Sequence, residues 1–205
     1  MQAKPNFFGT PFFIPGKFGF FVCVHESACF APIINVFYQK GCVFMFGKLK
    51  SMFGGGGISI PAPVAGQAVP LTEVSDPTFS QGILGQGCAI KPEVGRIVAP
   101  VDATVSMMFE TGHAVSLDTS DGVELLIHVG LDTVMLKGAH YTVHCATGDK
   151  VKAGDLLIEF NIEDIRAAGY DTITPVVVCN SDDFSEIQAK IGPVTAMGEL
   201  LTLKK

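Results

Sequence analysis

Short apolar runs separated by turn residues constrain the fold of this chain most strongly. Beyond Gly57, stretches rich in β-branched residues alternate with turns that contain Gly, Pro and Asp, a pattern typical of strands. The runs that predict strands are 96–108, 113–117, 123–129, 156–160 and 175–179, with one short helical turn at 162–168 and an irregular strand at 185–189. This pattern predicts an all-β domain over residues 58–205, folded as an antiparallel sandwich or barrel.

An internal repeat refines this expectation. Residues 60–66, with sequence IPAPVAG, recur 37 positions later as IVAPVDA at residues 97–103. Ile, Ala, Pro and Val coincide in register, which favours a sandwich of the duplicated hybrid-motif type whose edges close against each other. Chance similarity is the alternative. Residues 148–155 also resemble a carrier-domain turn, but Lys150 and Lys152 do not lie at a tight hairpin tip, so we do not favour a lipoyl or biotinyl carrier.

The first 44 residues differ from the rest of the chain. They carry a net charge of +2 within a total of −6, and they hold ten of the sixteen phenylalanines. Their apolar stretch at 18–39 is interrupted by charged residues and Pro32, so it does not match a transmembrane helix, and signal-peptide features are weak. We expect residues 1–44 to be a non-globular extension upstream of the true start at Met45. A membrane-associating segment and a structural extension are the alternatives.

Residues 45–57 predict a short amphipathic leader followed by a glycine tether. Apolar residues recur at helical spacing over 45–53, with Lys48 and Lys50 between them, so this segment can make weak peripheral contact with an anionic membrane. An unstructured leader is the alternative, and Gly54–Gly57 is flexible in either case. The acidic pI of about 5.3 argues against nucleic acid as a partner.

Two histidines are expected to meet on one hairpin. The strands predicted at 112–117 and 123–129 are joined by a short polar loop. A four-residue loop pairs His113 directly with His128, and a two-residue Asp121-Gly122 turn places them diagonally on the same face. Facing imidazoles can bind a metal with a third ligand, act as a nucleophile with a supporting donor, or form a surface pair without a role. The spacing leaves these three readings open.

A family resemblance distinguishes among these readings. Residues 122–134, with sequence GVELLIHVGLDTV, resemble the signature around the phosphorylated histidine of glucose-type enzyme IIA components. These belong to the bacterial phosphoenolpyruvate-dependent sugar phosphotransferase system. Further similarity follows in chain order at GQGCAIKP (85–92), VAPVD (98–102), FETGHA (109–114), LKG (136–138), GD (154–155) and ITPV (173–176). The resemblance covers about residues 58–203, and the segment 46–51 also resembles the start of the family.

The resemblance implies an antiparallel β-sandwich and a phosphotransferase that works as a relay. His128 matches the nucleophile that takes a phosphoryl group from the phosphocarrier protein HPr and passes it to a cysteine of a sugar-specific IIB domain. His113 matches the histidine that stabilises the phosphoryl group and is needed for onward transfer. Thr111 matches a supporting hydrogen-bond partner. The resemblance also implies a cytoplasmic protein, peripheral to the inner face of the membrane when it engages the permease, that requires no cofactor.

Apolar residues around the pair are expected to form a docking face for partner proteins. These are Phe109, Val129, Leu131 and Val134, for which ordinary strand packing is the alternative. A backbone carbonyl near Gly130 is expected to bond the second ring nitrogen of the nucleophile and fix its tautomer.

A second function remains open beside the relay. In it, the domain is a regulatory binding module whose target proteins sense the phosphorylation of His128, with a zinc ion shared by His113, His128 and a partner's carboxylate. The chain departs from the family at Val129, where Phe is common, and at 139–141, where Ala-His-Tyr replaces Glu-Gly-Phe. His140 and His144 match no family ligand and are expected to be exposed.

Overall fold

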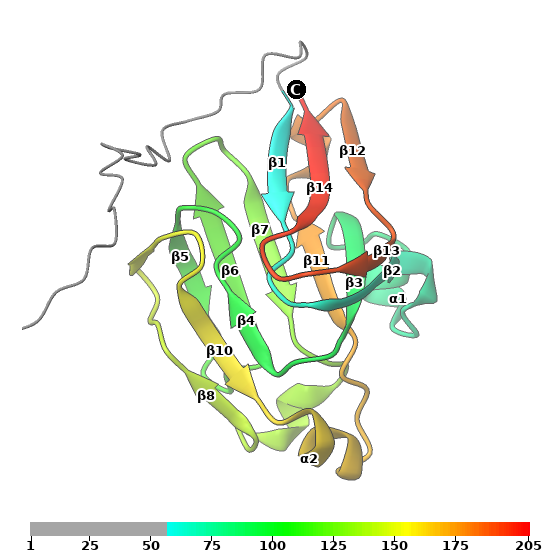
Figure 1. The fold of residues 1–205 in the computed structure, drawn as a ribbon, viewed down its shortest axis with the longest axis vertical. Helices are drawn as coiled ribbons and strands as arrows, with labels where there is room; N and C mark the ends of the chain where they lie inside the picture. Colours follow the sequence, from blue (N-terminus) through cyan, green and yellow to red (C-terminus); the bar gives the residue numbers. More distant parts are fainter. Residues whose placement is uncertain (1–56) are drawn as a thin grey trace, which may run out of the picture. The chain divides into compact units, whose positions relative to one another are not determined.

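The structure is a computed structural model that describes residues 57–205, so the predictions for residues 1–44 and for the leader at 45–56 lie outside the described residues. Strands dominate this part of the chain (Figure 1). In chain order its elements are β1 (Ile58–Pro61), β2 (Gly66–Pro70), η1 (Leu71–Glu73), α1 (Pro77–Ser80), β3 (Gln86–Pro92), β4 (Arg96–Val98), β5 (Ala103–Met108), β6 (Ala114–Thr119), β7 (Glu124–His128), η2 (Thr133–Leu136), β8 (Tyr141–Val143), β9 (Lys150–Val151), β10 (Leu156–Phe160), α2 (Ile162–Ala167), β11 (Thr174–Val178), η3 (Ser181–Asp183), β12 (Glu186–Ala189), β13 (Gly192–Val194) and β14 (Glu199–Lys204).

The strands form an antiparallel sandwich. One sheet has eight strands in the order β13-β2-β3-β11-β7-β6-β5-β9, and two three-stranded sheets have the orders β1-β14-β12 and β4-β10-β8. In Figure 1 the two small sheets lie in front of the large one. The core is the apolar layer between them, and its fully buried members include Ile60, Ile97, Leu117, Ile127 and Leu201. The all-β prediction is therefore confirmed for the described residues.

The predicted duplication is visible in matching backbone contacts of its two copies. Ala62 donates to Gly198 at 2.7 Å and accepts from Met197 at 2.8 Å. Ala99, its counterpart, makes the same two bonds to Asp155 and Gly154, each at 2.8 Å. The strands on either side of these residues repeat this relation, since β1 pairs with β14 as β4 does with β10, and β2 pairs with β13 as β5 does with β9. The repeated motif therefore builds both halves of the sandwich.

Most predicted elements are found within a residue or two, with one correction. The run 96–108 is not a single strand, because the chain turns between β4 and β5 at Pro100, which lacks a backbone donor for a ladder. The short helix α2 forms where it was expected, capped by the Asn161 side chain, whose Oδ1 accepts from the backbone amides of Glu163 and Asp164, each at 3.1 Å. Helix α1 was not predicted.

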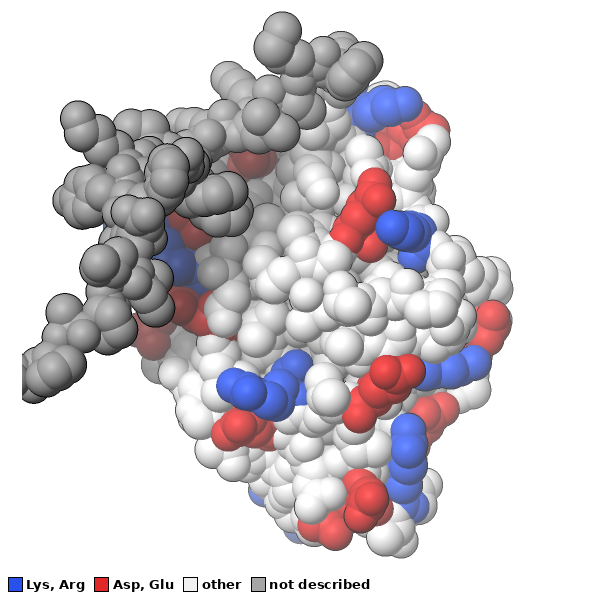
Figure 2. Space-filling view, viewed as in Figure 1, with Lys and Arg blue, Asp and Glu red and all other residues white. Residues whose placement is uncertain are grey.

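The surface of the described residues carries charges of both signs. Acidic and basic side chains are interspersed over the uncovered part of the face in Figure 2, without a continuous basic stripe there. Within residues 57–205, no helix has the length and apolar character needed to cross a bilayer.

Candidate functional site

The hairpin of β6 and β7 brings the two predicted histidines into contact. The ring centroids of His113 and His128 lie 4.9 Å apart, with the ring planes at 79°. Neither predicted register is right, because Ala114 is the residue opposite His128. The connection has three residues and is closed by a bond from the Thr119 amide to the Val123 carbonyl at 3.0 Å. Gly122, with φ of +80°, takes the left-handed position that ends such a turn.

A tight turn before β6 directs His113 toward its partner. Regular alternation from Ala114 would place the preceding side chain on the opposite face of the sheet. The chain instead turns through Gly112, whose amide donates to the Phe109 carbonyl at 2.7 Å and whose φ is +66°. A side chain at Gly112 would lie 2.7 Å from the Val143 side chain, so the turn has no room for one. The imidazoles therefore meet as predicted, but through this turn.

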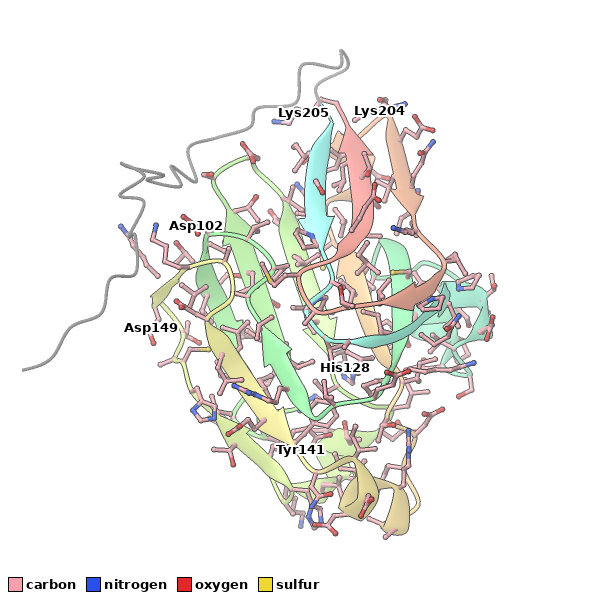
Figure 3. All side chains as sticks on the ribbon, in the orientation of Figure 1. Asp102, His128, Tyr141, Asp149, Lys204 and Lys205 are labelled. Carbon is pink, nitrogen blue, oxygen red and sulfur yellow. The ribbon has the colours of Figure 1, made fainter. Side chains whose placement is uncertain are left out.

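The backbone fixes the tautomer of His128, which lies at the end of β7 (Figure 3). Its Nδ1 lies 2.8 Å from the Gly130 carbonyl oxygen. Because a carbonyl only accepts, Nδ1 carries the hydrogen and Nε2 keeps its lone pair. Gly130 has φ of +79°, and a Cβ there would lie 2.6 Å from the Asp171 carbonyl oxygen. The predicted carbonyl contact is confirmed.

His113 has its own supporting hydroxyl. Its Nδ1 lies 2.5 Å from Oγ1 of Thr111, the residue that the family resemblance implies for this role. When the hydroxyl donates, Nε2 of His113 keeps its hydrogen and can donate to an oxyanion. As a residue, His113 is 5% exposed. The two imidazoles thus present complementary nitrogens, one a nucleophile and one a donor.

Aromatic rings flank the pair on both sides. Phe109 meets His113 edge-on with centroids 5.3 Å apart, and Phe79 lies tilted against His128 at 5.2 Å. Phe79, which α1 places against His128, was not among the predicted site residues. The signal that could have found it is Asp76-Pro77, because an N-cap aspartate followed by proline marks a helix start.

Burial keeps both imidazoles neutral. Desolvation, reinforced by the neighbouring His128, lowers the pKa of His113 to about 4. Desolvation also lowers the pKa of His128, although the Gly130 carbonyl and the carboxylates of Asp76 and Asp132 act in the opposite direction. A neutral imidazole with a free Nε2 is a good nucleophile near pH 7.

We expect the domain to lose stability as the pH falls from about 6.5 toward 4. In this range His113 binds a proton in the unfolded chain but stays neutral in the folded domain. The unfolded state therefore takes up more protons as the pH falls, and the free energy of unfolding decreases. Between pH 7.5 and 5, urea unfolding should show a loss about 2 kcal/mol larger in the wild type than in His113→Gln. An equal loss in both proteins would contradict the lowered pKa.

The predicted docking residues divide into buried and exposed groups. Val129 has no exposed surface and packs in the main core, because it points away from the face that carries His128. Its expected docking role is therefore wrong, and packing is its role. Leu131 is also buried, against the second core cluster, and Phe109 is half-buried. Val134 is 49% exposed and lies in η2 beside Met135, which is 65% exposed.

The other two histidines of the described residues lie away from this pair. His140 and His144 are exposed, as predicted, and face carboxylates of Asp164 at 3.4 Å and Glu159 at 2.9 Å. Within the described residues, no cluster of three or more His, Cys, Asp or Glu side chains is placed to hold a metal ion. The central pair offers two imidazole ligands.

An antiparallel sandwich that presents two neutral imidazoles in contact, one with a free Nε2, has the arrangement of a phosphoryl-carrier domain. Residues 58–184 match the family model described as phosphoenolpyruvate-dependent sugar phosphotransferase system, EIIA 1. The chain belongs to this family, and the resemblance seen in its sequence motifs is confirmed.

Individual relatives agree with the family match. The chain is 42% identical over 140 residues to the glucose-specific EIIA component of Oceanobacillus iheyensis, covering 68% of this chain and 85% of that protein. It is 48% identical over 145 residues to the β-glucoside-specific EIIBCA component of Bacillus subtilis, covering 70% of this chain and 24% of that one. The chain thus spans about a quarter of the length of the Bacillus subtilis relative. The solved glucose permease IIA from Mycoplasma capricolum matches with a TM-score of 0.69 at 30% identity, over 73% of this chain and 97% of that one.

Proposed function

We propose that this domain is the phosphoryl carrier of a glucose-type sugar phosphotransferase system. His128 accepts a phosphoryl group from phospho-HPr and passes it to the cysteine of a IIB domain. The observation that carries this proposal is the bond from Nδ1 of His128 to the Gly130 carbonyl, which leaves Nε2 as a free nucleophile beside His113. Membership of the EIIA 1 family supports it.

The two transfers balance without an added proton. In the first, the Nε2 lone pair attacks phosphorus, the N–P bond of the donor breaks, and the donor imidazole leaves with the bonding pair. The ring of His128 then carries positive charge, which the Gly130 carbonyl stabilises through Nδ1–H. In the second, a thiolate attacks the same phosphorus and His128 leaves as neutral imidazole. His113 donates through Nε2 to the phosphoryl oxygens in both steps.

The surroundings of His128 indicate the chemistry of the partner surfaces. Asp76 and Asp132 lie close enough to raise its pKa, so a phosphoryl group arrives in a negative environment. A partner that supplies basic side chains compensates for this charge. Val134 and Met135 of η2 add exposed apolar surface a few residues beyond the nucleophile. A partner with an apolar contact surface ringed by basic groups therefore fits this site.

The proposal extends to the place where the domain works. We place it at the cytoplasmic side of the membrane, where a sugar permease presents its IIB domain. The leader at 45–53 would add weak peripheral contact through its lysines, an expectation that rests on the sequence alone. In the Bacillus subtilis relative, the name EIIBCA joins A, B and C components in one protein.

The test is phosphoryl uptake by the full chain. Incubation with phosphoenolpyruvate, enzyme I and HPr should add one acid-labile phosphoryl group, read by intact mass, and omission of HPr should prevent it. Subsequent addition of a IIB domain should remove the group. No uptake with an HPr that phosphorylates another IIA protein would overturn the proposal.

A second candidate is a regulatory module that binds target proteins through zinc. With His113 in its other tautomer, Nδ1–H toward Thr111, the two contacting imidazoles would supply two ligands of a tetrahedral zinc site, and a partner's carboxylate would supply a third. Zinc would then bridge His113 and His128 to the target. Target binding that requires zinc, and that phosphorylation of His128 abolishes, would favour this function. Binding unaffected by a chelator would exclude it.

A further inference from the structure

One buried carbonyl next to the nucleophile accepts two side-chain hydrogen bonds. The Val129 carbonyl oxygen lies 2.7 Å from Thr133 Oγ1 and 3.0 Å from the Tyr141 hydroxyl. Thr133 comes from η2, four residues along the chain, whereas Tyr141 comes from β8 in another sheet. The two hydroxyls use both lone pairs of the carbonyl, so they fix the direction in which it points.

The Val129 carbonyl and the Gly130 amide belong to the same peptide group. The amide of Val129 donates to the His113 carbonyl at 2.6 Å, and the amide of Gly130 donates to the Ile173 carbonyl at 3.1 Å. The Gly130 carbonyl in turn accepts from Nδ1 of His128. Because the Val129–Gly130 peptide is rigid, its orientation sets the backbone from which the Gly130 carbonyl projects. A loosened Val129 carbonyl would therefore loosen the bond that fixes the tautomer of His128.

Packing around Tyr141 fixes its side chain, so that its hydroxyl can hold the Val129 carbonyl in one orientation. Tyr141 pairs with Phe160 across β8 and β10, and the two rings stack with centroids 6.3 Å apart at 25°. Burial raises the pKa of Tyr141, so its hydroxyl keeps its hydrogen and donates to the carbonyl. The same strand packs against the turn that aims the second histidine, since a Cβ at Gly112 would lie 3.3 Å from Cβ of Tyr141. Figure 3 shows Tyr141 below His128.

We propose that Tyr141 is a positioning residue for phosphoryl transfer. Its hydroxyl, together with that of Thr133, holds the Val129 carbonyl so that the Gly130 carbonyl keeps His128 in the Nδ1–H tautomer. This role rests on the proposed function. A phenylalanine at this position would lack the donor and leave the carbonyl to Thr133 alone.

The test compares Tyr141→Phe with Tyr170→Phe, which makes the same chemical change at another tyrosine packed on the core. Nitrogen-detected NMR of the imidazoles reports the tautomer of His128 and its titration midpoint. In Tyr141→Phe we expect a larger Nε2–H population and a lower midpoint, because the Gly130 bond raises the pKa of His128. The rate of uptake at saturating HPr should fall about five-fold, the effect of one neutral hydrogen bond, with KM for HPr unchanged. Tyr170→Phe should match the wild type in the tautomer population of His128, in its titration midpoint and in the rate of uptake.

An unchanged tautomer population and midpoint in Tyr141→Phe would overturn the proposal, because a merely structural tyrosine would alter the melting temperature alone. If that variant does not fold, Thr133→Val removes the other hydroxyl from the same carbonyl and should give the same NMR signature. A folded Thr133→Val with a wild-type signature would overturn the proposal as well. If the wild type takes up no phosphoryl group, the proposed function fails, and the NMR comparison still decides whether Tyr141 positions His128.

Discussion

Replacement of His128 by glutamine is expected to abolish phosphoryl uptake from phospho-HPr. Glutamine has a similar length and keeps a polar group at the end of β7, but its amide is not a nucleophile. The other imidazole cannot substitute readily, because the Thr111 hydroxyl donates to Nδ1 of His113 and its Nε2 therefore carries the hydrogen and has no lone pair for attack. Uptake should fall to about 10⁻⁴ of the wild-type rate or less, as when other covalent nucleophiles are removed. Intact mass after incubation with enzyme I, HPr and phosphoenolpyruvate measures this.

A matched control separates the nucleophile from the other histidines. His144 is exposed and pairs with Glu159 on β10, so His144→Gln should take up one phosphoryl group at the wild-type rate. Unfolding in urea should show that both variants are folded. A phosphoryl group found on His113 of the His128→Gln protein would contradict the assignment of roles within the pair.

The strands and the histidine pair could be predicted because both depend on local sequence. Turn residues and β-branched runs locate β6, β7, β10 and β11 to within a residue or two, and the motif around His128 identifies the nucleophile. The register could not be predicted in the same way. It depends on whether the loop has two, three or four residues, and the left-handed conformation of Gly122 selects three.

Contacts between segments that are distant in the chain could not be predicted from local sequence patterns. Val129 was expected at the surface because it adjoins His128, yet alternation along the chain turns it into the core. Phe79 and Tyr141 reach the site from elements about fifty residues before and thirteen after the nucleophile. Asp76-Pro77 marks the start of α1, but no local pattern shows that either ring contacts the site. Such residues become visible when the sheets are assembled, because their partners lie on other strands.

Replacement of His113 by glutamine is expected to slow the transfer from His128 to a IIB cysteine much more than the uptake from phospho-HPr. In uptake, the attacking group is a neutral imidazole, so little negative charge is added to the phosphoryl oxygens. In onward transfer, a thiolate brings a full negative charge, which Nε2–H of His113 is placed to stabilise beside His128. We therefore expect uptake to remain and transfer to a IIB cysteine to slow about 10²–10³-fold, the usual effect of removing one such donor.

The phosphorylated variant can be prepared and its discharge by a IIB domain followed by intact mass. Thr111→Val supplies a graded control, since it keeps His113 but removes the hydroxyl that holds Nδ1. Its onward transfer should slow less than that of His113→Gln, and in the same direction. Equal slowing of uptake and discharge in His113→Gln would mean that this histidine acts on the neutral attack as strongly as on the thiolate. His113 would then not act by compensating the negative charge of the attacking thiolate.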